Sequence, residues 1–368
     1  MKQATTYPSV AVSLNTDKRF AALRRLFRSA SFCTSLMLLI IVPALFLTSC
    51  QKEDTPMTLP PPGDLETMVA AMGNSYDNQV YVDLSTGSQV TVPYKSFDLA
   101  FEAAPNGWRI YLNTAKYMFV ANTGAITFSA ADTTGAAWKT ETDNLYDDST
   151  AIGDWRSASS TAGAEVYVLD RGRTEHFGTD RWRKFQVLSC DSFSYTFRFC
   201  NMNNTGVTDY TITKDPNYSL MYFSFNSGGL AVQVAPPKNS WDLVFTKYTH
   251  TYYDEPPDSP YRYYMVSGAL LNRWSDARNA IMKKDSTIGY KPFEEVKAAD
   301  MINYTFYKEA AIIGFEWKTY DFNLGYLIIP DLYYLLLDHE GYYYKIRFYD
   351  FYDSQGNKGA ASFEYQRL

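Results

Sequence analysis

A pattern of short strands and turns occurs twice in this chain of 368 residues, and it constrains the fold more than any other feature. The first copy, residues 80–101, has an alternating strand that ends in Ser-Thr-Gly, a second strand, and then Phe-Asp-Leu-Ala-Phe. The second copy, residues 221–245, keeps this order and ends in Trp-Asp-Leu-Val-Phe. Alternation closed by a glycine turn is typical of β-hairpins. The repeat therefore predicts an all-β fold with two tandem antiparallel β domains.

The later parts of the two halves also match. In each half a strand enters a polar turn and a second strand leaves it, at residues 165–187 and at residues 331–348. We therefore expect a first, divergent β domain at residues 66–213 and a second at residues 214–368. Short helices are expected at residues 65–72 and 293–299, and nothing in the pattern predicts a long one.

The first 49 residues have the features of a secretory signal. Three arginines precede residues 29–49, a stretch of 21 residues without charge whose centre is almost wholly apolar. The stretch leads into Leu47-Thr48-Ser49-Cys50, which resembles the lipobox of bacterial lipoproteins, where the signal is cut before the cysteine and the thiol receives a diacylglycerol. A plain transmembrane anchor is the alternative, because this length can span a bilayer. We expect a signal peptide at residues 1–49, lipidation of Cys50, and a flexible tether at residues 50–65.

Charge narrows the range of partners. The chain has 34 Lys and Arg against 40 Asp and Glu, and residues 1–49 hold six of the bases and one of the acids, so the chain from Cys50 onward has a formal net charge of −11. No nucleic-acid partner is expected, because such binding needs a basic face. The segment Gln51-Lys52-Glu53-Asp54 resembles the acidic surface-export signal of some Gram-negative anaerobes, with a solvated linker as the plain alternative. We expect a protein anchored by lipid in the outer membrane and exposed at the cell surface.

The second half resembles the HmuY family of haem-binding surface lipoproteins. Four segments carry the resemblance in order: Met221–Gly229, Trp241–Phe245, Gly341–Lys345 and Gly356–Tyr365. The first half is a weaker copy, in which Phe97 stands for the tryptophan. The resemblance implies an all-β fold, haem as the bound cofactor, haem or host haem proteins as partners in iron acquisition, and an outer-membrane receptor. The family's iron ligands vary, so none can be assigned here by matching.

Two residues are the candidate haem ligands, and hence the candidate metal ligands. His250 lies just past the strand that ends at Phe245, in a proline-containing loop, and Met265 begins the next strand. A hairpin could bring both to one pocket, and imidazole and thioether groups both bind haem iron. The plain alternative is a solvated histidine and a core methionine. Tyr248 or Met282 could serve instead.

The segment around these candidates offers aromatic rings and two cations. Its tyrosines suit a porphyrin or a sugar as well as a strand edge, and they are Tyr248, Tyr252, Tyr253, Tyr261, Tyr263 and Tyr264. Arg262 and Arg273 are the nearby cations that could offset haem propionates.

The remaining polar residues indicate no catalysis. Asp98 and Asp242, each between two apolar strand positions, are expected to point outward and tie a neighbouring loop. His176 and His339 fall in equivalent turns, and nothing indicates a disulfide between the later cysteines at 190 and 200. No nucleophile, phosphate-loop or paired-carboxylate motif occurs, so we do not expect an enzyme. The sequence favours a haem-binding surface lipoprotein, with a surface adhesin or glycan-binding lipoprotein on the same fold as the alternative.

Overall fold

The computed structural model describes residues 61–144, 149–156, 164–172 and 175–368. The expected signal peptide, Cys50 and most of the tether lie outside the described residues. Pro61–Leu368 forms one compact unit. The part of the chain that is described consists of antiparallel β-sheets joined by loops and short 3-10 turns, so the all-β class expected from the repeat is confirmed.

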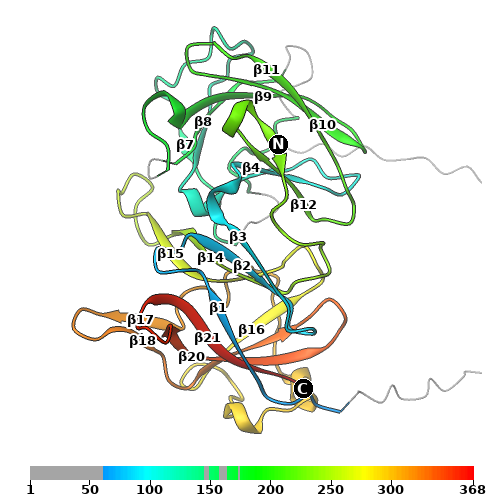
Figure 1. Ribbon diagram of the computed structural model, residues 1–368, viewed down its shortest axis with the longest axis vertical. Helices are drawn as coiled ribbons and strands as arrows, with labels where there is room; N and C mark the ends of the chain where they lie inside the picture. The colour runs from blue at the N-terminus through cyan, green and yellow to red at the C-terminus, as the bar shows by residue number, and fades with distance from the viewer. Residues whose placement is uncertain (1–60, 145–148, 157–163, 173–174) are drawn as a thin grey trace, which may run out of the picture. The chain divides into compact units, whose positions relative to one another are not determined.

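Four sheets make up most of the unit (Figure 1). Sheet A has the strand order β1-β21-β20-β19-β16, and sheet B has the order β15-β14-β2-β3. Their strands are β1 (Glu66–Ala71), β2 (Asn78–Val82), β3 (Gln89–Pro93), β14 (Leu243–Thr251), β15 (Tyr263–Leu271), β16 (Arg278–Lys283), β19 (Leu332–Leu337), β20 (Tyr343–Tyr352) and β21 (Lys358–Arg367). A separate hairpin pairs β17 (Lys318–Asp321) with β18 (Gly325–Ile328).

The other two sheets come from the middle of the chain. Sheet C has the order β13-β12-β4-β5, and sheet D has the order β11-β10-β9-β8-β6-β7. Their strands are β4 (Leu99–Glu102), β5 (Ile110–Leu112), β6 (Phe119–Asn122), β7 (Trp138–Lys139), β8 (Tyr167–Asp170), β9 (Trp182–Cys190), β10 (Ser194–Cys200), β11 (Thr208–Thr213), β12 (Leu220–Ser224) and β13 (Leu230–Val232).

Neither of the two predicted helices is present. A strand replaces the first, and short 3-10 turns replace the second. Residues 65–72 form strand β1 rather than a helix, because Met68 and Ala70 alternate with exposed neighbours and pair with β21. Residues 293–299 contain two short turns instead of one helix. The turns are η1 (Tyr94–Ser96), η2 (Thr114–Lys116), η4 (Gly178–Arg181), η5 (Asn226–Gly228), η6 (Phe293–Glu295) and η7 (Ala298–Asn303).

Alternation along the strands decides which face of each sheet is buried. In β10, the rings of Tyr195, Phe197 and Phe199 are buried on one face. On the other face, Arg198 forms an exposed ion pair with Asp209 across the ladder to β11. Period-two alternation of this kind produces a sheet that packs through one side.

The sheets stack in the order D, C, B, A, from top to bottom in Figure 1. Sheets C and D enclose one core, which includes Phe101, Phe197 and Phe223. Sheets A and B enclose a second core, which includes Phe245 and Phe363. A third cluster joins the outer faces of sheets B and C. Sheets C and D therefore form one two-sheet sandwich, and sheets A and B form another. The two sandwiches pack against each other through the third cluster.

The repeat found in the sequence is present in the structure, but its two copies exchange strands. Strand β2 of the first copy pairs with β14 of the second, and β12 of the second pairs with β4 of the first. The registers are equivalent, because Tyr81 lies opposite Val244 and Tyr222 lies opposite Ala100. Strand β1, at the start of the first half, also pairs with β21 at the end of the second half.

The expected domain boundary between residues 213 and 214 is therefore wrong. The sandwich of sheets C and D is contiguous and spans residues 99–232, whereas the sandwich of sheets A and B combines residues 66–93 with residues 243–367. Hairpin signals are local, so they located the repeat correctly. They carry no information on which copy a hairpin pairs with, and the exchange was missed for that reason.

Candidate functional site

The hairpin of β14 and β15 carries both candidate haem ligands. His250 lies inside β14 and not in the loop after it, opposite Tyr264, and Met265 lies opposite Thr249. Neighbouring residues of a strand point to opposite faces. The hairpin therefore directs His250 and Met265 to opposite faces, and the side chain that shares the face of His250 is Tyr264. The expectation that one pocket receives both ligands is not met in this geometry.

The imidazole of His250 is oriented by a carboxylate. Its Nδ1 lies 2.5 Å from an oxygen of Asp143, which is buried. A carboxylate at Nδ1 fixes the ring and leaves Nε2 as the nitrogen that can bind a metal. No sequence signal points to Asp143, because it stands 107 positions before His250 in a loop without a motif.

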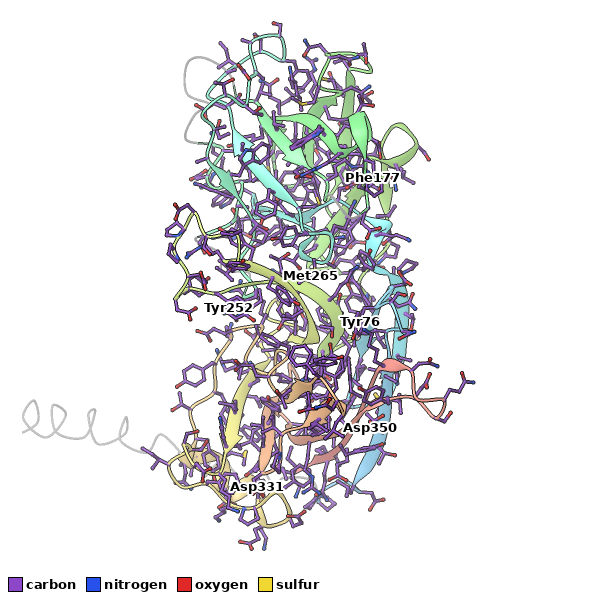
Figure 2. The ribbon with its side chains drawn as sticks, turned by 90° about the vertical axis from the view of Figure 1, so that its left-hand side faces the viewer. Tyr76, Phe177, Tyr252, Met265, Asp331 and Asp350 are labelled. Carbon is purple, nitrogen blue, oxygen red and sulfur yellow. The ribbon has the colours of Figure 1, made fainter. Side chains whose placement is uncertain are left out.

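Aromatic rings hold the imidazole on two sides. The ring of Tyr252 is edge-on to His250 with centroids 4.7 Å apart, and the ring of Phe315 is edge-on at 5.0 Å. The side chain of His250 is 22% exposed, so the ring is reachable from solvent. Tyr252 lies just beyond β14, and Figure 2 labels both Tyr252 and Met265.

The tyrosines expected to form a platform fall into two groups. Tyr253, Tyr261 and Tyr264 are 61%, 73% and 61% exposed, and the guanidinium of Arg262 lies over the ring of Tyr253. Tyr248 is fully buried in the cluster between sheets B and C. Tyr263 lies against Phe119, with ring centroids 5.5 Å apart. Only the first group can form a surface for a planar or ring-shaped molecule.

The other ligand and cation candidates lie elsewhere. Met282 is buried in a cluster beneath sheet A with Phe293 and Tyr333, where it serves as core. Arg262 stays at the tip of the hairpin, and its Nη1 donates to the carbonyl of Glu255. Arg273 follows β15 at the opposite end of the hairpin from His250. Arg262 is therefore the cation of the two that remains near the exposed tyrosines.

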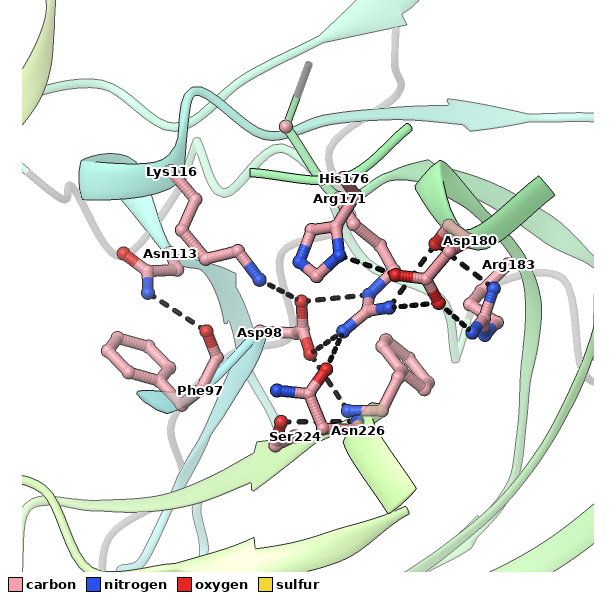
Figure 3. Close-up of polar contacts among 12 residues, drawn as sticks. Phe97, Asp98, Asn113, Lys116, Arg171, His176, Asp180, Arg183, Ser224 and Asn226 are labelled. Carbon is pink, nitrogen blue, oxygen red and sulfur yellow. Dashed lines mark hydrogen bonds and ion pairs between the residues drawn. The ribbon is translucent and has the colours of Figure 1, made fainter. Parts of the chain in front are cut away.

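Asp98 is buried and structural. Its carboxylate lies between the ammonium of Lys116 and the guanidinium of Arg171, and all three side chains have no exposure (Figure 3). It also accepts a hydrogen bond from the backbone N–H of Phe225, in the loop after β12. Burial raises the pKa of Asp98, but Lys116 and Arg171 outweigh it and hold the pKa below its usual value. The predicted loop tie is present, and the predicted outward orientation is wrong.

Asp242 makes the equivalent tie in the second copy. Its carboxylate accepts a hydrogen bond from the backbone N–H of Leu84, in the turn after β2, and it is also buried. Burial, opposed by the Leu84 hydrogen bond, raises the pKa of Asp242 to about 7, and the nearby Asp338 raises it further. Each aspartate thus binds the backbone of a hairpin in the other copy, and both carboxylates are buried.

The remaining histidines and cysteines indicate no further site. His176 and His339 lie in the equivalent turns β8–β9 and β19–β20, as expected, and Nδ1 of His176 contacts Asp180. Cys190 and Cys200 are free thiols, and their registers do not place them opposite each other. Across the described ranges, no group of three or more His, Cys, Asp and Glu side chains is arranged to hold a metal ion. None of the helical segments in those ranges is long and apolar enough to cross a membrane.

Comparison with known proteins gives distant structural neighbours. A scan of protein-family models and a search of curated proteins each give no match. Among solved structures, apo PinO from Porphyromonas gingivitis has 11% identity and a TM-score of 0.24, over 83% of this chain and 97% of that one. The apo HmuY analogue of Tannerella forsythia has 12% identity and a TM-score of 0.24, over 84% of this chain and 98% of that one.

A third neighbour is an HmuY-like protein from Bacteroides vulgatus, with 10% identity and a TM-score of 0.21, over 82% of this chain and 90% of that one. Its description names haem as a candidate ligand. TM-scores and identities of this size carry no argument about the fold or the ligand of this chain. The fold class follows from the strands themselves, and the site is argued from its own contacts.

Proposed function

We propose that this chain binds haem without catalysing a reaction, and that His250 supplies an axial ligand. The observation that carries the proposal is the contact between Nδ1 of His250 and the buried carboxylate of Asp143. Histidines that bind a metal through Nε2 usually donate their other N–H to a carboxylate or carbonyl group, which fixes the ring and raises its basicity. Histidine is also one of the side chains that bind haem iron as an axial ligand.

The surroundings of His250 suit a flat, apolar ligand. Tyr264 shares its face of the hairpin, and the rings of Tyr252 and Phe315 flank the imidazole. Exposed tyrosine rings offer apolar area together with a hydroxyl group that tolerates water, which matches a porphyrin that has one edge in solvent. Met265 stays a candidate only for a ligand that reaches the other face of the hairpin.

The expected anchor completes the proposal. Lipidation of Cys50 would hold the chain at the outer membrane on the cell surface, where free haem or a host haem protein could be captured and passed to a receptor. Two or more acyl chains hold a protein stably, whereas one chain gives marginal binding. Replacement Cys50→Ser should abolish incorporation of a labelled fatty acid, and labelling that persists would place the lipid elsewhere.

A haemin titration of the purified chain tests the proposal. We expect a saturable shift of the Soret band, a weaker and displaced band in His250→Ala, and reduced affinity in Asp143→Asn, which keeps the volume but removes the charge. Met265→Ala is the matched control on the opposite face, and it should leave the spectrum unchanged. A spectrum equal to free haemin, or an unchanged Soret position in His250→Ala, would overturn the proposal.

The exposed tyrosines favour one second candidate. Tyr253, Tyr261 and Tyr264 present rings on a single hairpin, as glycan-binding surfaces do. In this case the chain would be a surface adhesin or glycan-binding lipoprotein. Binding to a glycan array that is lost in Tyr264→Ala, together with no haemin binding, would favour this function.

A further inference from the structure

A cavity lies where sheets B and C face each other, apart from the surface around His250. Its volume is about 80 Å³, and it is open to solvent on one side. The walls come from both sheets and from η2, and they include Tyr81, Phe97, Ala100, Tyr222, Trp241 and Leu270. No charged side chain lines it. Native interiors contain few voids larger than a water molecule, so a cavity of this size in a packed interface is unusual.

The internal repeat shows what is missing from this cavity. The amide of Asn113 donates to the carbonyls of Tyr94 and Phe97. The amide of Asn272 donates in the same way to the carbonyls of Lys238 and Trp241. These two asparagines are therefore equivalent.

The residue two positions after each asparagine differs between the copies. In the second copy this residue is Trp274, whose indole packs edge-on to Tyr111 with centroids 6.0 Å apart. In the first copy it is Ala115, which is buried and lines the cavity. The residue equivalent to Tyr111 is Leu270, by the pairs Ala100–Tyr111 and Val244–Leu270. The space beside Ala115 and Leu270 is thus the place where the other copy holds an indole ring.

A second difference enlarges the same space. Ala100 lines the cavity at the position that is Val244 in the other copy. The rings around it are otherwise arranged equivalently, because Tyr81 is edge-on to Trp241 at 5.0 Å and Tyr222 is edge-on to Phe97 at 4.8 Å. The aromatic walls are therefore in place, and only the side chains that would fill the centre are small.

The lining of the cavity also includes neutral polar groups. Gln79 lines it where the other copy has Leu220, and the hydroxyl of Tyr81 donates to the side-chain carbonyl of Gln79. Thr114 and Thr246 also line it. These groups can exchange hydrogen bonds with a hydroxyl group, and they offer nothing to neutralise a charge. The occupant they suit is uncharged, with one polar end.

We propose that this cavity binds a small uncharged molecule with one aromatic ring and a hydroxyl group, of the size of phenol. The ring takes the place that the indole of Trp274 takes in the other copy, between Ala115 and Leu270. The hydroxyl group meets the side chain of Gln79. The volume is roughly half that of an engineered cavity that accepts benzene, so a single ring fills it with one edge at the opening.

Phenol binding to the purified full chain tests this proposal. We expect a saturable rise of the thermal midpoint and ligand-observed NMR saturation transfer to phenol, with benzene bound roughly 3- to 10-fold more weakly because it lacks the hydrogen bond. Benzoate should not bind, since the cavity has no cation. The variant Ala115→Trp fills the space with the side chain of the other copy, and it should lose phenol binding at least tenfold.

Two further variants keep the test decisive. Ala100→Val introduces the valine that the other copy has at this position, which is a smaller change than Ala115→Trp. It should weaken phenol binding, and it keeps the test possible if Ala115→Trp does not fold. His250→Ala should bind phenol as the native chain does, which separates this cavity from the proposed haem site. Absence of phenol binding to the native chain, or unchanged affinity in a folded Ala115→Trp or Ala100→Val, would overturn the proposal.

Discussion

Asp98 and Asp242 occupy equivalent positions, but their electrostatic surroundings differ. Asp98 pairs with Arg171, whose backbone N–H donates to the carbonyl of Arg181 across the β8–β9 turn. In the second copy the residue in that place is Asp338, whose N–H donates to the carbonyl of Tyr342. The position of the cation Arg171 in the first copy is thus occupied by the acid Asp338 in the second. Two replacements of similar size should therefore have very different costs.

Replacement of Asp98 by Asn should destabilise the protein strongly. It leaves Lys116 buried without its counter-charge and leaves Arg171 paired with Asp180 alone, and breaking a buried ion pair from one side costs about 3–5 kcal/mol. Asp242→Asn is the matched control, and it should cost less than about 1 kcal/mol near pH 6, because Asn can still accept the hydrogen bond from Leu84. Urea unfolding of both variants measures the difference, and equal costs would contradict this account.

Asp242 should make the protein less stable as the pH rises from about 4 to about 7. The pKa of Asp242 rises on folding from its usual value of 3.8 to about 7, mainly through burial. Folding therefore favours the protonated form, so this contribution is fully present below about pH 4 and is lost as the pH passes about 7.

The pKa shift of Asp242 also sets the size of the pH effect and suggests a control variant. A shift of this kind corresponds to on the order of 2–4 kcal/mol in the free energy of unfolding. In Asp242→Asn the slope between pH 5 and pH 8 should become smaller, while part of it remains because burial also raises the pKa of Asp338. Urea midpoints at several pH values check this, and an identical slope in the variant would assign it to other groups.

At the level of elements, strand β15 lies unusually close to the segment before β17. A Cβ added at Gly268 would lie 2.1 Å from the carbonyl oxygen of Gly314. The neighbouring Ala269 exchanges backbone hydrogen bonds with Gly314, donating at 2.9 Å. This contact holds the segment that carries Phe315 against the hairpin of His250.

Gly268→Ala should therefore destabilise the fold by at least about 2 kcal/mol, because the methyl group meets backbone that cannot move aside. The same variant should weaken haemin binding, since Phe315 flanks His250. Gly63→Ala serves as the control, because an added Cβ there would lie 3.3 Å from the Cβ of Arg367, a contact that a shift of a few tenths of an ångström relieves. Thermal unfolding compares the two, and equal midpoints would show that β15 and this segment can separate without cost.

The elements also show how far the sequence could predict the structure. Alternation and glycine turns located the hairpins correctly, because both signals are local. The face on which His250 lies depends on its pairing with Tyr264, and the role of Asp143 depends on a loop from the other sandwich. Such contacts leave no trace in the local pattern. The sequence predicted that Asp98 and Asp242 each bind a neighbouring loop. It could not predict that both side chains are buried, because this depends on the sheet packed against them.

For the whole molecule, the exchange of strands sets which fragments can fold. Residues 66–213 lack β12 and β13, so they leave sheet C incomplete, and residues 214–368 lack β1, β2 and β3. Residues 94–240 contain every strand of sheets C and D. We expect residues 94–240 to unfold cooperatively as an isolated fragment, and residues 66–213 to lack such a transition.

Circular dichroism during heating, together with the dispersion of the amide NMR signals, compares the two fragments. Mixing residues 66–213 with residues 214–368 should restore a cooperative transition, since the missing strands are then supplied by the partner fragment. A cooperative transition in residues 66–213 alone would mean that sheet C does not need the strands of the second copy.

The pairing of β1 with β21 has a consequence for how the protein is made. Residues 66–71 have no partner strand until residues 360–365 have been synthesised, because these two segments form one ladder. The sandwich of sheets A and B thus stays incomplete on a growing or partly translocated chain. A chain that crosses a membrane through the secretion pore must remain unfolded until it has passed. Late closure of the ladder between the first and last strands therefore suits the proposed export, in which this sandwich would be completed only after the last residues have emerged.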